Sequence, residues 1–332
     1  MSGPYGNRVL TNLPAGAARY AWQGQDYWHD GFGWWQPSWV GDSVYYNWAY
    51  PPVGYYYPTL PTDYNTVEMN GNTYYEAEGV YYQEGEQDGQ KGYVVAEAPE
   101  TAEQPAAGEV EGENPFKIFK NMCDYLAGLD TFSMVAETTV DEMGLSGEKV
   151  QVSAQRILYV SRPNKVAVDV AGDRGTKRIV YDGKTVSMLD RGENIYTVVQ
   201  VPDTIDAALD TLAQDYGVVV PLEDLMYKDL YDRAVARVSA GQYLGLHMVD
   251  NLKCHHLAFS TDVANWEVWI DAGDKPAPRQ ITVDYGQNTA RSRYSADITG
   301  WVGSPELKAE KFKFELPDGA TRVEITPNPS KS

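Results

Sequence analysis

Two stretches of alternating apolar and polar residues flank one short helical insert, and this layout constrains the fold more than any single residue. The stretches run from Thr131 to Val201 and from Ala236 to Ile325, and the insert covers Pro202 to Arg233. A period of two with short turns, such as Asp182-Gly183 as a two-residue hairpin turn, predicts antiparallel strands. We expect an α+β fold in which a long antiparallel sheet curls around the inserted helices and encloses an apolar hollow.

The insert supplies the residues that we expect to cover this hollow. Pro202-Asp203-Thr204 is typical of a helix start, an apolar stripe follows, and Gly217 ends the helix. A second helix is predicted over Pro221 to Arg233. The candidate contacts of an apolar ligand, which include two tryptophans from the second stretch of strands, are Ile205, Leu209, Leu212, Tyr216, Leu225, Met226, Trp266 and Trp269. If these side chains instead fill the hollow at ordinary packing density, they form a plain core and hold no ligand.

The negative charge of the chain argues against anionic partners. The 332 residues include 27 Lys and Arg against 47 Asp and Glu, a formal net charge of −20. Nucleic acid and anionic membrane surfaces would therefore be repelled. The 43% apolar and 12% aromatic residues are enough for a packed core.

Targeting signals are not apparent in the sequence. It has no run of about 18 apolar residues, so we predict that no segment spans a bilayer. The start, Met1-Ser2-Gly3-Pro4, lacks the charged and apolar regions of a signal peptide. We expect either a cytoplasmic chain or a mature chain that carries an added Met.

Residues 1–95 are rich in aromatic side chains and contain an internal repeat. Residues 1–93 hold 15 of the 25 Tyr and 6 of the 9 Trp. The segment Trp22-Gln23-Gly24 recurs 47 residues later as Met69-Asn70-Gly71, and each copy is typical of a β-hairpin with a tight turn. The residues that we predict as an interaction surface for glycans or an envelope protein are Trp22, Trp28, Trp34, Trp35, Tyr74, Tyr75, Tyr81 and Tyr82. Packing within small hairpin domains explains the same residues equally well.

Composition divides the chain into four parts. After the repeat region at 1–95, residues 96–113 are rich in Ala, Glu, Pro and Gly without apolar periodicity, which is typical of a flexible acidic linker. Asn114 and Pro115 then predict the start of a helix that Gly128 ends. We expect a folded domain over residues 114–326, with its last strands near 312–316 and 322–325, and a short tail at 327–332.

No residue pattern points to a reaction, a metal or a cofactor. The sequence has no Gly-x-Ser-x-Gly, Gly-x-x-x-x-Gly-Lys or His-Glu-x-x-His motif. Cys254 and His256 share one strand face, but zinc needs three or four ligands, and the only histidines away from this strand are His29 and His247. A packed Cys and a hydrogen-bonded His are the better interpretation. Cys123 and Cys254 are a candidate disulfide or two separate buried thiols.

Several segments of the C-terminal two-thirds occur in the order of one known family. They are Tyr125-Leu126-Ala127-Gly128-Leu129, Ala136-Glu137-Thr138-Thr139, Gly172-Asp173-Arg174-Gly175, Tyr181-Asp182-Gly183-Lys184, Thr204-Ile205-Asp206-Ala207-Ala208-Leu209, Cys254-His255-His256-Leu257-Ala258-Phe259 and Trp266-Glu267-Val268-Trp269-Ile270. Through them, residues 114–326 resemble the predicted periplasmic proteins called domain of unknown function 2092. The resemblance implies a fold similar to the lipoprotein carriers LolA and LolB and to LppX, an incomplete β-barrel covered by helices whose hollow accepts acyl chains.

The N-terminal part shows a second resemblance. Arg8-Val9-Leu10 with Leu13-Pro14-Ala15-Gly16, and Gly79-Val80-Tyr81-Tyr82 with Gly92-Tyr93-Val94-Val95, resemble a Tyr-rich module of bacterial envelope proteins, domain of unknown function 6515. The two resemblances imply a periplasmic or cell-surface location in a bacterium, with the signal peptide already removed.

Two functions from different classes follow. The first is a non-enzymatic envelope protein that shelters a lipid or the acyl chain of a lipoprotein between the sheet and the helices. The second is a structural or adhesive surface protein, whose aromatic repeats bind glycans or other copies while the larger domain is a spacer.

Overall fold

The protein divides into two compact units. The computed structural model describes residues 7–22, 24–30, 33–61, 64–69, 71–77, 80–97, 114–143, 148–285 and 291–327. Unit 1 comprises Met1–Lys117 and Ser239–Leu244, and unit 2 comprises Ile118–Val238 and Gly245–Ser332. Most of the predicted linker, residues 98–113, lies outside the described residues.

The first sheet of unit 1 joins residues that are far apart in the sequence. Strands β2 (Ala18–Trp22), β3 (Gln25–His29), β4 (Trp34–Val40) and β5 (Ser43–Ala49) pair in sequence order. Strand β1 (Asn7–Leu10) pairs on one side with β5 and on the other with residues 240–243 of β17 (Val238–Val249). This pairing explains why residues 239–244 belong to unit 1 and not to the predicted domain 114–326.

The second sheet of unit 1 has the strand order β6-β10-β9-β8-β7. The strands are β6 (Tyr56–Tyr57), β7 (Asn65–Met69), β8 (Asn72–Ala77), β9 (Val80–Gln87) and β10 (Gln90–Ala96). Met69 pairs with Asn72 in this sheet as Trp22 pairs with Gln25 in the first. Gly24 and Gly71 each have φ of 80°, a backbone angle that glycine adopts at no steric cost.

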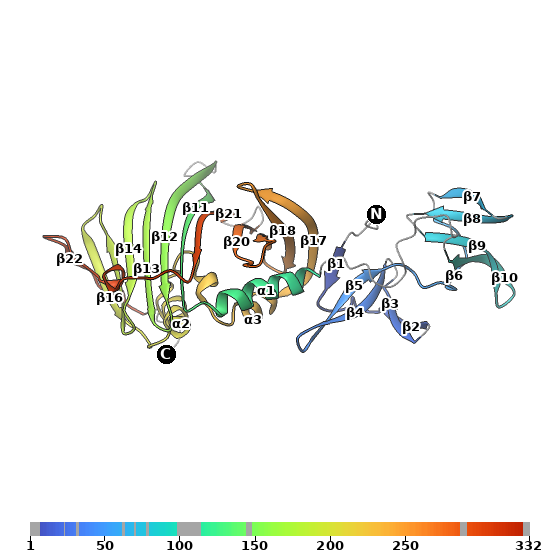
Figure 1. The fold of residues 1–332 in the computed structure, drawn as a ribbon, viewed down its shortest axis with the longest axis horizontal. Helices are drawn as coiled ribbons and strands as arrows, with labels where there is room; N and C mark the ends of the chain where they lie inside the picture. The colour runs from blue at the N-terminus through green and yellow to red at the C-terminus, as the bar shows by residue number, and fades with distance from the viewer. Residues whose placement is uncertain are drawn as a thin grey trace. The chain divides into compact units, whose positions relative to one another are not determined.

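Unit 2 contains a large sheet that is not closed. Its strands are β11 (Thr131–Met143), β12 (Lys149–Ser161), β13 (Lys165–Gly172), β14 (Gly175–Tyr181), β15 (Thr185–Asp190), β16 (Ile195–Gln200), β18 (Leu252–Thr261), β19 (Asn265–Asp271), β20 (Pro278–Asp284), β21 (Arg291–Gly303) and β22 (Thr321–Arg322). Their pairings run in one line, β22-β16-β15-β14-β13-β12-β11-β21-β20-β19-β18, without returning to the start. All are antiparallel except β16 with β22. Figure 1 shows the curvature of these strands. The protein is mostly sheet with few helices, as the sequence predicts.

The turn between β14 and β15 differs from the prediction by one residue. The backbone N–H of Asp182 donates to the carbonyl of Thr185, so the turn is centred on Gly183 and Lys184 and not on Asp182-Gly183. The side chain of Asp182 accepts hydrogen bonds from the N–H groups of Lys184 and Thr185. These bonds satisfy the two backbone N–H groups and hold Asp182 at the start of the turn.

The helices begin where the sequence places capping residues. Helix α1 (Pro115–Ala127) starts after Asn114, whose side chain accepts from the N–H of Phe116 at 2.9 Å. Helix α2 (Ile205–Tyr216) has Thr204 as its N-cap and Gly217, at φ 65°, as its C-cap. Within the described residues, every helix is too short or too polar to span a bilayer.

Three predicted elements differ in form from the structure. The second helix of the insert is broken into the 3-10 turn η1 (Glu223–Met226) and the short helix α3 (Leu230–Val235), because Tyr227 has an extended backbone that ends η1. The strand expected near 312–316 is absent from the described residues; a 3-10 turn, η2 (Ala309–Phe312), lies there instead. Of the strand expected near 322–325, only β22 at Thr321–Arg322 forms.

The two faces of strands β11 to β16 are buried by different parts of the chain. We call the face with Phe132, Val160 and Val166, which are paired neighbours, the inner face. Its Tyr181 hydroxyl donates to the carbonyl of Pro202, at the start of the insert, at 2.6 Å. The outer face carries Ala167 and Val180, which pack in one cluster with Phe312 of η2. The C-terminal segment therefore contacts the outer face and the insert contacts the inner face.

Candidate apolar ligand site

The apolar side of the insert is buried in unit 2. Ile205, Leu209 and Leu212 of α2 are buried, as are Leu225 and Met226 of η1. These five candidate residues share the interior of unit 2, and Leu212 and Met226 have no exposed surface at all. Tyr216, at the end of α2, is half-buried.

Two hydrogen bonds attach the insert to the residues that directly follow β12. The N–H of Ile205 donates to the carbonyl of Pro163 at 3.0 Å. The Nη1 of Arg162 donates to the carbonyl of Met226 at 2.7 Å. The insert is thus connected at both α2 and η1 to the same end of one strand.

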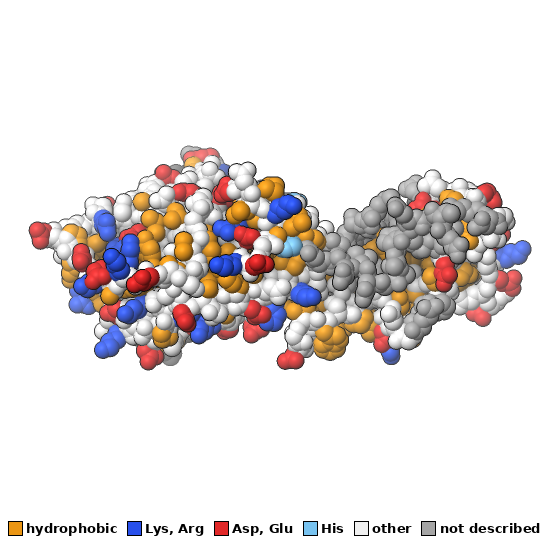
Figure 2. Space-filling model, viewed as in Figure 1, with side chains coloured by type: hydrophobic (Ala, Val, Ile, Leu, Met, Phe, Trp, Pro, Cys, Tyr) orange, Lys and Arg blue, Asp and Glu red, His pale blue; other side chains and the backbone are white. Residues whose placement is uncertain are grey.

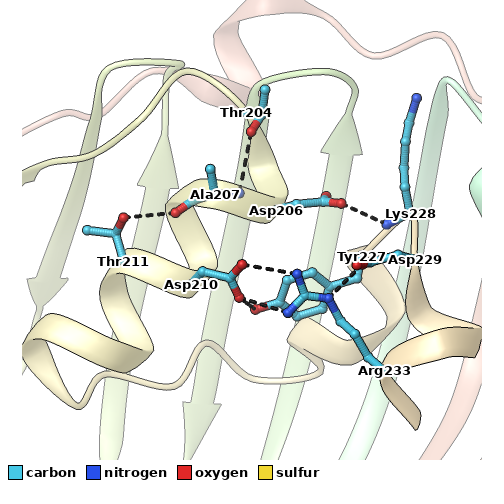
Figure 3. A network of polar contacts seen from close by, with 9 residues as sticks. All are labelled: Thr204, Asp206, Ala207, Asp210, Thr211, Tyr227, Lys228, Asp229 and Arg233. Atoms are coloured by element: carbon cyan, nitrogen blue, oxygen red, sulfur yellow. Dashed lines mark hydrogen bonds and ion pairs between the residues drawn. The ribbon is translucent and has the colours of Figure 1, made fainter. Parts of the chain in front are cut away.

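A polar network, which we call the clamp, joins α2 to the segment after η1 (Figure 3). The guanidinium of Arg233 donates to both oxygens of Asp210, at 2.9 and 3.0 Å, and to Asp229 at 2.6 Å. Tyr227 donates to Asp210 at 3.2 Å, and its ring lies 4.0 Å from the guanidinium carbon of Arg233. The hydrogen bonds from Arg233 hold the pKa of Asp210 below its usual value.

The clamp is a feature that sequence analysis missed. The N–H of Lys228 adds a bond to Asp206 at 3.1 Å, so two turns of α2 take part. The available signal was the spacing of Asp206 and Asp210, which places both carboxylates on one helix face. Arg233, the partner of Asp210, lies 23 residues beyond it in the sequence, and no local periodicity identifies this pairing.

The inner face is covered unevenly. The row of Phe132, Val160 and Val166 is buried, and Phe132 has no exposed surface. Further along the same face, Val140, Val152, Val170, Ile179 and Met188 are only half-buried. Unit 2 therefore presents apolar side chains on its inner face that its own core covers only in part.

The two candidate tryptophans lie on opposite faces of β19. Trp266 contacts Phe119 of α1 and Phe259 of β18, with ring centroids 5.2 and 4.2 Å away. Trp269 stacks on His256, with centroids 3.9 Å apart and the ring planes 15° from parallel. Since residues three apart in a strand point to opposite sides, the structure separates the two.

His256 is held by hydrogen bonds. Its Nε2 lies 2.7 Å from Glu267 and its Nδ1 lies 3.1 Å from Nδ1 of His247. Burial lowers the pKa of His256, while Glu267 opposes this shift. Within the described residues, no group of three or more His, Cys, Asp or Glu side chains is placed to hold a metal ion.

The candidate disulfide is not formed. Cys123 in α1 and Cys254 in β18 are both free and buried. The thiol of Cys254 instead donates to the carbonyl of Leu252 at 3.7 Å, and burial raises the pKa of both thiols. The two residues are therefore separate buried thiols, which was the other interpretation of the sequence.

The aromatic candidates of unit 1 pack largely against one another. Trp34, Trp35 and Tyr82 are buried in three separate clusters. Half-buried positions are occupied by Trp28, Tyr74, Tyr75 and Tyr81, and the side chain of Trp22 lies outside the described residues. Edge-to-face contacts such as that of Tyr27 with Trp34 are typical of an aromatic core.

Unit 2 combines an open, curved antiparallel sheet with a short helical insert on its inner face. The chain belongs to the family described as predicted periplasmic protein (DUF2092), which matches residues 116–326. The resemblance found in the sequence is confirmed for this part. The match begins at residue 116, and the resemblance of the N-terminal part to a Tyr-rich module stays a prediction.

Several solved structures match part of this chain at low identity. An uncharacterized conserved protein from Thermus thermophilus is 11% identical with a TM-score of 0.37, over 62% of this chain and 96% of that one. The lipoprotein LppX from Mycobacterium tuberculosis is 14% identical with a TM-score of 0.36, over 56% and 94%. A LolA superfamily protein from Nitrosomonas europaea is 8% identical with a TM-score of 0.30, over 59% and 96%. A comparison with curated proteins gives no match.

Proposed function

We propose that unit 2 binds an apolar ligand, such as the acyl chain of a lipid or lipoprotein, against its inner face, and that it performs no chemistry on it. The observation that carries this proposal is the set of half-buried apolar side chains on the inner face, which includes Val152, Val170 and Ile179. Partly exposed apolar side chains that adjoin a buried core on one face are typical of a binding surface. The family description as periplasmic supports a location in the cell envelope.

Burial of an acyl chain supplies enough free energy for such binding. Each buried CH₂ contributes roughly 0.8 kcal/mol, so ten of them contribute about 8 kcal/mol before the entropy of association is subtracted. This gross figure corresponds to micromolar affinity at best. The acyl chain itself needs no charged partner in the protein.

The insert has two roles in this proposal. The residues that are already buried, which include Leu209, Leu212 and Met226, hold the insert on the sheet and meet the ligand only when the insert moves. Tyr216 of the insert and Trp266 of β19 are half-buried, and they contact the ligand without such a movement. The clamp between Asp210 and Arg233 lets α2 and the segment 227–233 move as one body.

Titration of the full chain with a fluorescent fatty alcohol tests the proposal. We expect saturable binding with micromolar affinity and one site per chain, together with an emission shift that reports an apolar environment. A probe signal that rises linearly with protein concentration and does not saturate would contradict the proposal. An unlabelled fatty alcohol should displace the probe, whereas glycerol at the same concentration should not.

A further inference from the structure

We infer that the inner face carries a head-group site at Arg156, which accepts an anionic oxygen group such as a carboxylate or phosphate at the end of the apolar ligand. This inference rests on the proposed function and adds the chemical class of the ligand. Unit 2 buries several polar side-chain atoms that have no hydrogen-bond partner.

All of these unpartnered atoms are hydrogen-bond donors. Among the described residues, the buried side-chain nitrogen and oxygen atoms without a hydrogen bond are Nε of Arg156, Nε and Nη2 of Arg162, and Nε1 of Trp301. A buried donor that lacks an acceptor costs about 1–3 kcal/mol. The interior of unit 2 is therefore short of acceptors, and a ligand with negatively charged oxygens supplies them.

The donors lie on the inner face. Trp301 pairs with Met134 of β11, and its ring stacks on Phe132 with centroids 5.3 Å apart. The guanidinium of Arg162 lies 6.0 Å from the centre of the same Phe132 ring. Arg156 pairs with Ala136 of β11 in the next part of this face. The shortage of acceptors thus belongs to the surface that we assign to the ligand.

Arg156 is the donor that lies beside the half-buried apolar residues of the inner face. It pairs across the sheet with Val170, one of the half-buried apolar residues, and is itself half-buried. Arg162, by contrast, already donates to the carbonyl of Met226 and lies at the end of the strand. Among the ion pairs of the described residues, none involves Arg156. A cation in mainly apolar surroundings is stabilised by a counter-ion.

Tyr294 of β21 extends the site. Arg156 hydrogen-bonds to its side chain, and burial raises the pKa of Tyr294 to about 12, so the phenol keeps its proton at neutral pH. The fixed fork of a guanidinium suits a carboxylate or phosphate. Arg156 thus offers charge and directed donors, and Tyr294 holds the guanidinium in place.

Asp224 of η1 is a nearby carboxylate that disfavours the binding of an anion. Its side chain is exposed, yet the surrounding protein raises its pKa, and its charge acts on Tyr294. No hydrogen bond joins Asp224 to Arg156 among the contacts of the described residues. If Asp224 turned toward Arg156 in solution, it would be the counter-ion itself, so the test includes this residue.

The test compares two probes of equal chain length and fluorophore, a fatty acid and a fatty alcohol, on the full chain. We expect the fatty acid to bind at least about tenfold more tightly at neutral pH, the size expected for a hydrogen bond to a charged group. Arg156→Met should remove this preference, because it weakens the binding of the fatty acid about tenfold more than that of the alcohol. Arg293→Met is the matched control, because Arg293 is exposed on the opposite face of the same strand as Tyr294, and it should bind both probes as the wild type does.

Each other outcome overturns the inference in a recognisable way. Equal affinity of the wild type for acid and alcohol would overturn the head-group site and leave the proposed function intact. Binding of neither probe would overturn both. A rise of tenfold or more in fatty-acid affinity on Asp224→Asn, with no loss on Arg156→Met, would show that Asp224 already neutralises Arg156. The comparison within the wild type needs no variant, so it holds even if Arg156→Met fails to fold.

Discussion

Leu212→Asp is expected to lower the free energy of unfolding of unit 2 by at least about 4 kcal/mol. Leu212 has no exposed surface in the structure. The substitution leaves a cavity and buries a carboxylate among the apolar residues of α2. Since small domains are stable by only about 5–15 kcal/mol, the variant should be largely unfolded in mild denaturant. Urea unfolding followed by circular dichroism measures the change.

Val219→Asp provides the control for this prediction. Val219 is close to Leu212 in the sequence but is 68% exposed, so its replacement should change the free energy of unfolding by no more than about 0.5 kcal/mol. If Leu212→Asp also changed stability by less than about 1 kcal/mol, the apolar side of the insert would not be packed as the structure shows.

Val170→Gln is expected to weaken the binding of an apolar probe by at least about tenfold, with little change in stability. Val170 is half-buried on the inner face, so a polar amide there removes apolar contact area and must itself be desolvated when a ligand covers it. A loss of about 1.4 kcal/mol corresponds to this tenfold change. Fluorescence titration with the fatty alcohol measures the affinity, and urea unfolding measures the stability.

Ala171→Gln is the matched control for Val170→Gln. Ala171 is the next residue of β13, is exposed and points to the opposite face. It should bind the probe as tightly as the wild type. Equal losses of affinity for the two variants would place the probe elsewhere, and an unchanged affinity for Val170→Gln would remove the inner face from the proposal.

The sheet was predictable from the sequence because its signals are local. Alternation along β12 and β13 follows directly from the period of two. The caps Thr204 and Gly217 mark the ends of α2 correctly. The break of the second helix of the insert was not predictable in this way, because the extended backbone of Tyr227 accompanies a hydrogen bond to Asp210 of another helix.

The C-terminal segment shows a second limit of local signals. The apolar pattern around Phe312 predicts a strand, but Phe312 is buried against Ala167 and Val180 of the outer face. A single apolar side chain can be anchored on a sheet without joining its ladder. The pairing of β1 with β17 also depends on residues more than two hundred positions apart, and no short pattern reports it.

The candidate site was predictable only in part. The apolar stripe predicted for the insert includes Ile205, Leu209 and Leu212, and all three are buried. Trp266 and Trp269 were grouped together although alternation places them on opposite faces. The unpartnered donors, such as Nε of Arg156, depend on three-dimensional surroundings and have no sequence signature.

Charged side chains of both signs lie on the surface of the structure. Figure 2 shows Asp and Glu side chains mixed with Lys and Arg among apolar ones on the visible part of the described residues. Several of the cations are paired, as Arg178 is with Asp169 and Arg279 with Asp271.

Native mass spectrometry of the protein purified from a bacterial periplasm, without detergent, tests the central claim most directly. We predict a fraction of the chain that carries one apolar molecule, which organic solvent extracts and which adds back to the stripped protein one to one. A population that is entirely free of bound lipid, and that takes up none when mixed with fatty acids and phospholipids, would contradict the claim that the inner face binds an apolar ligand.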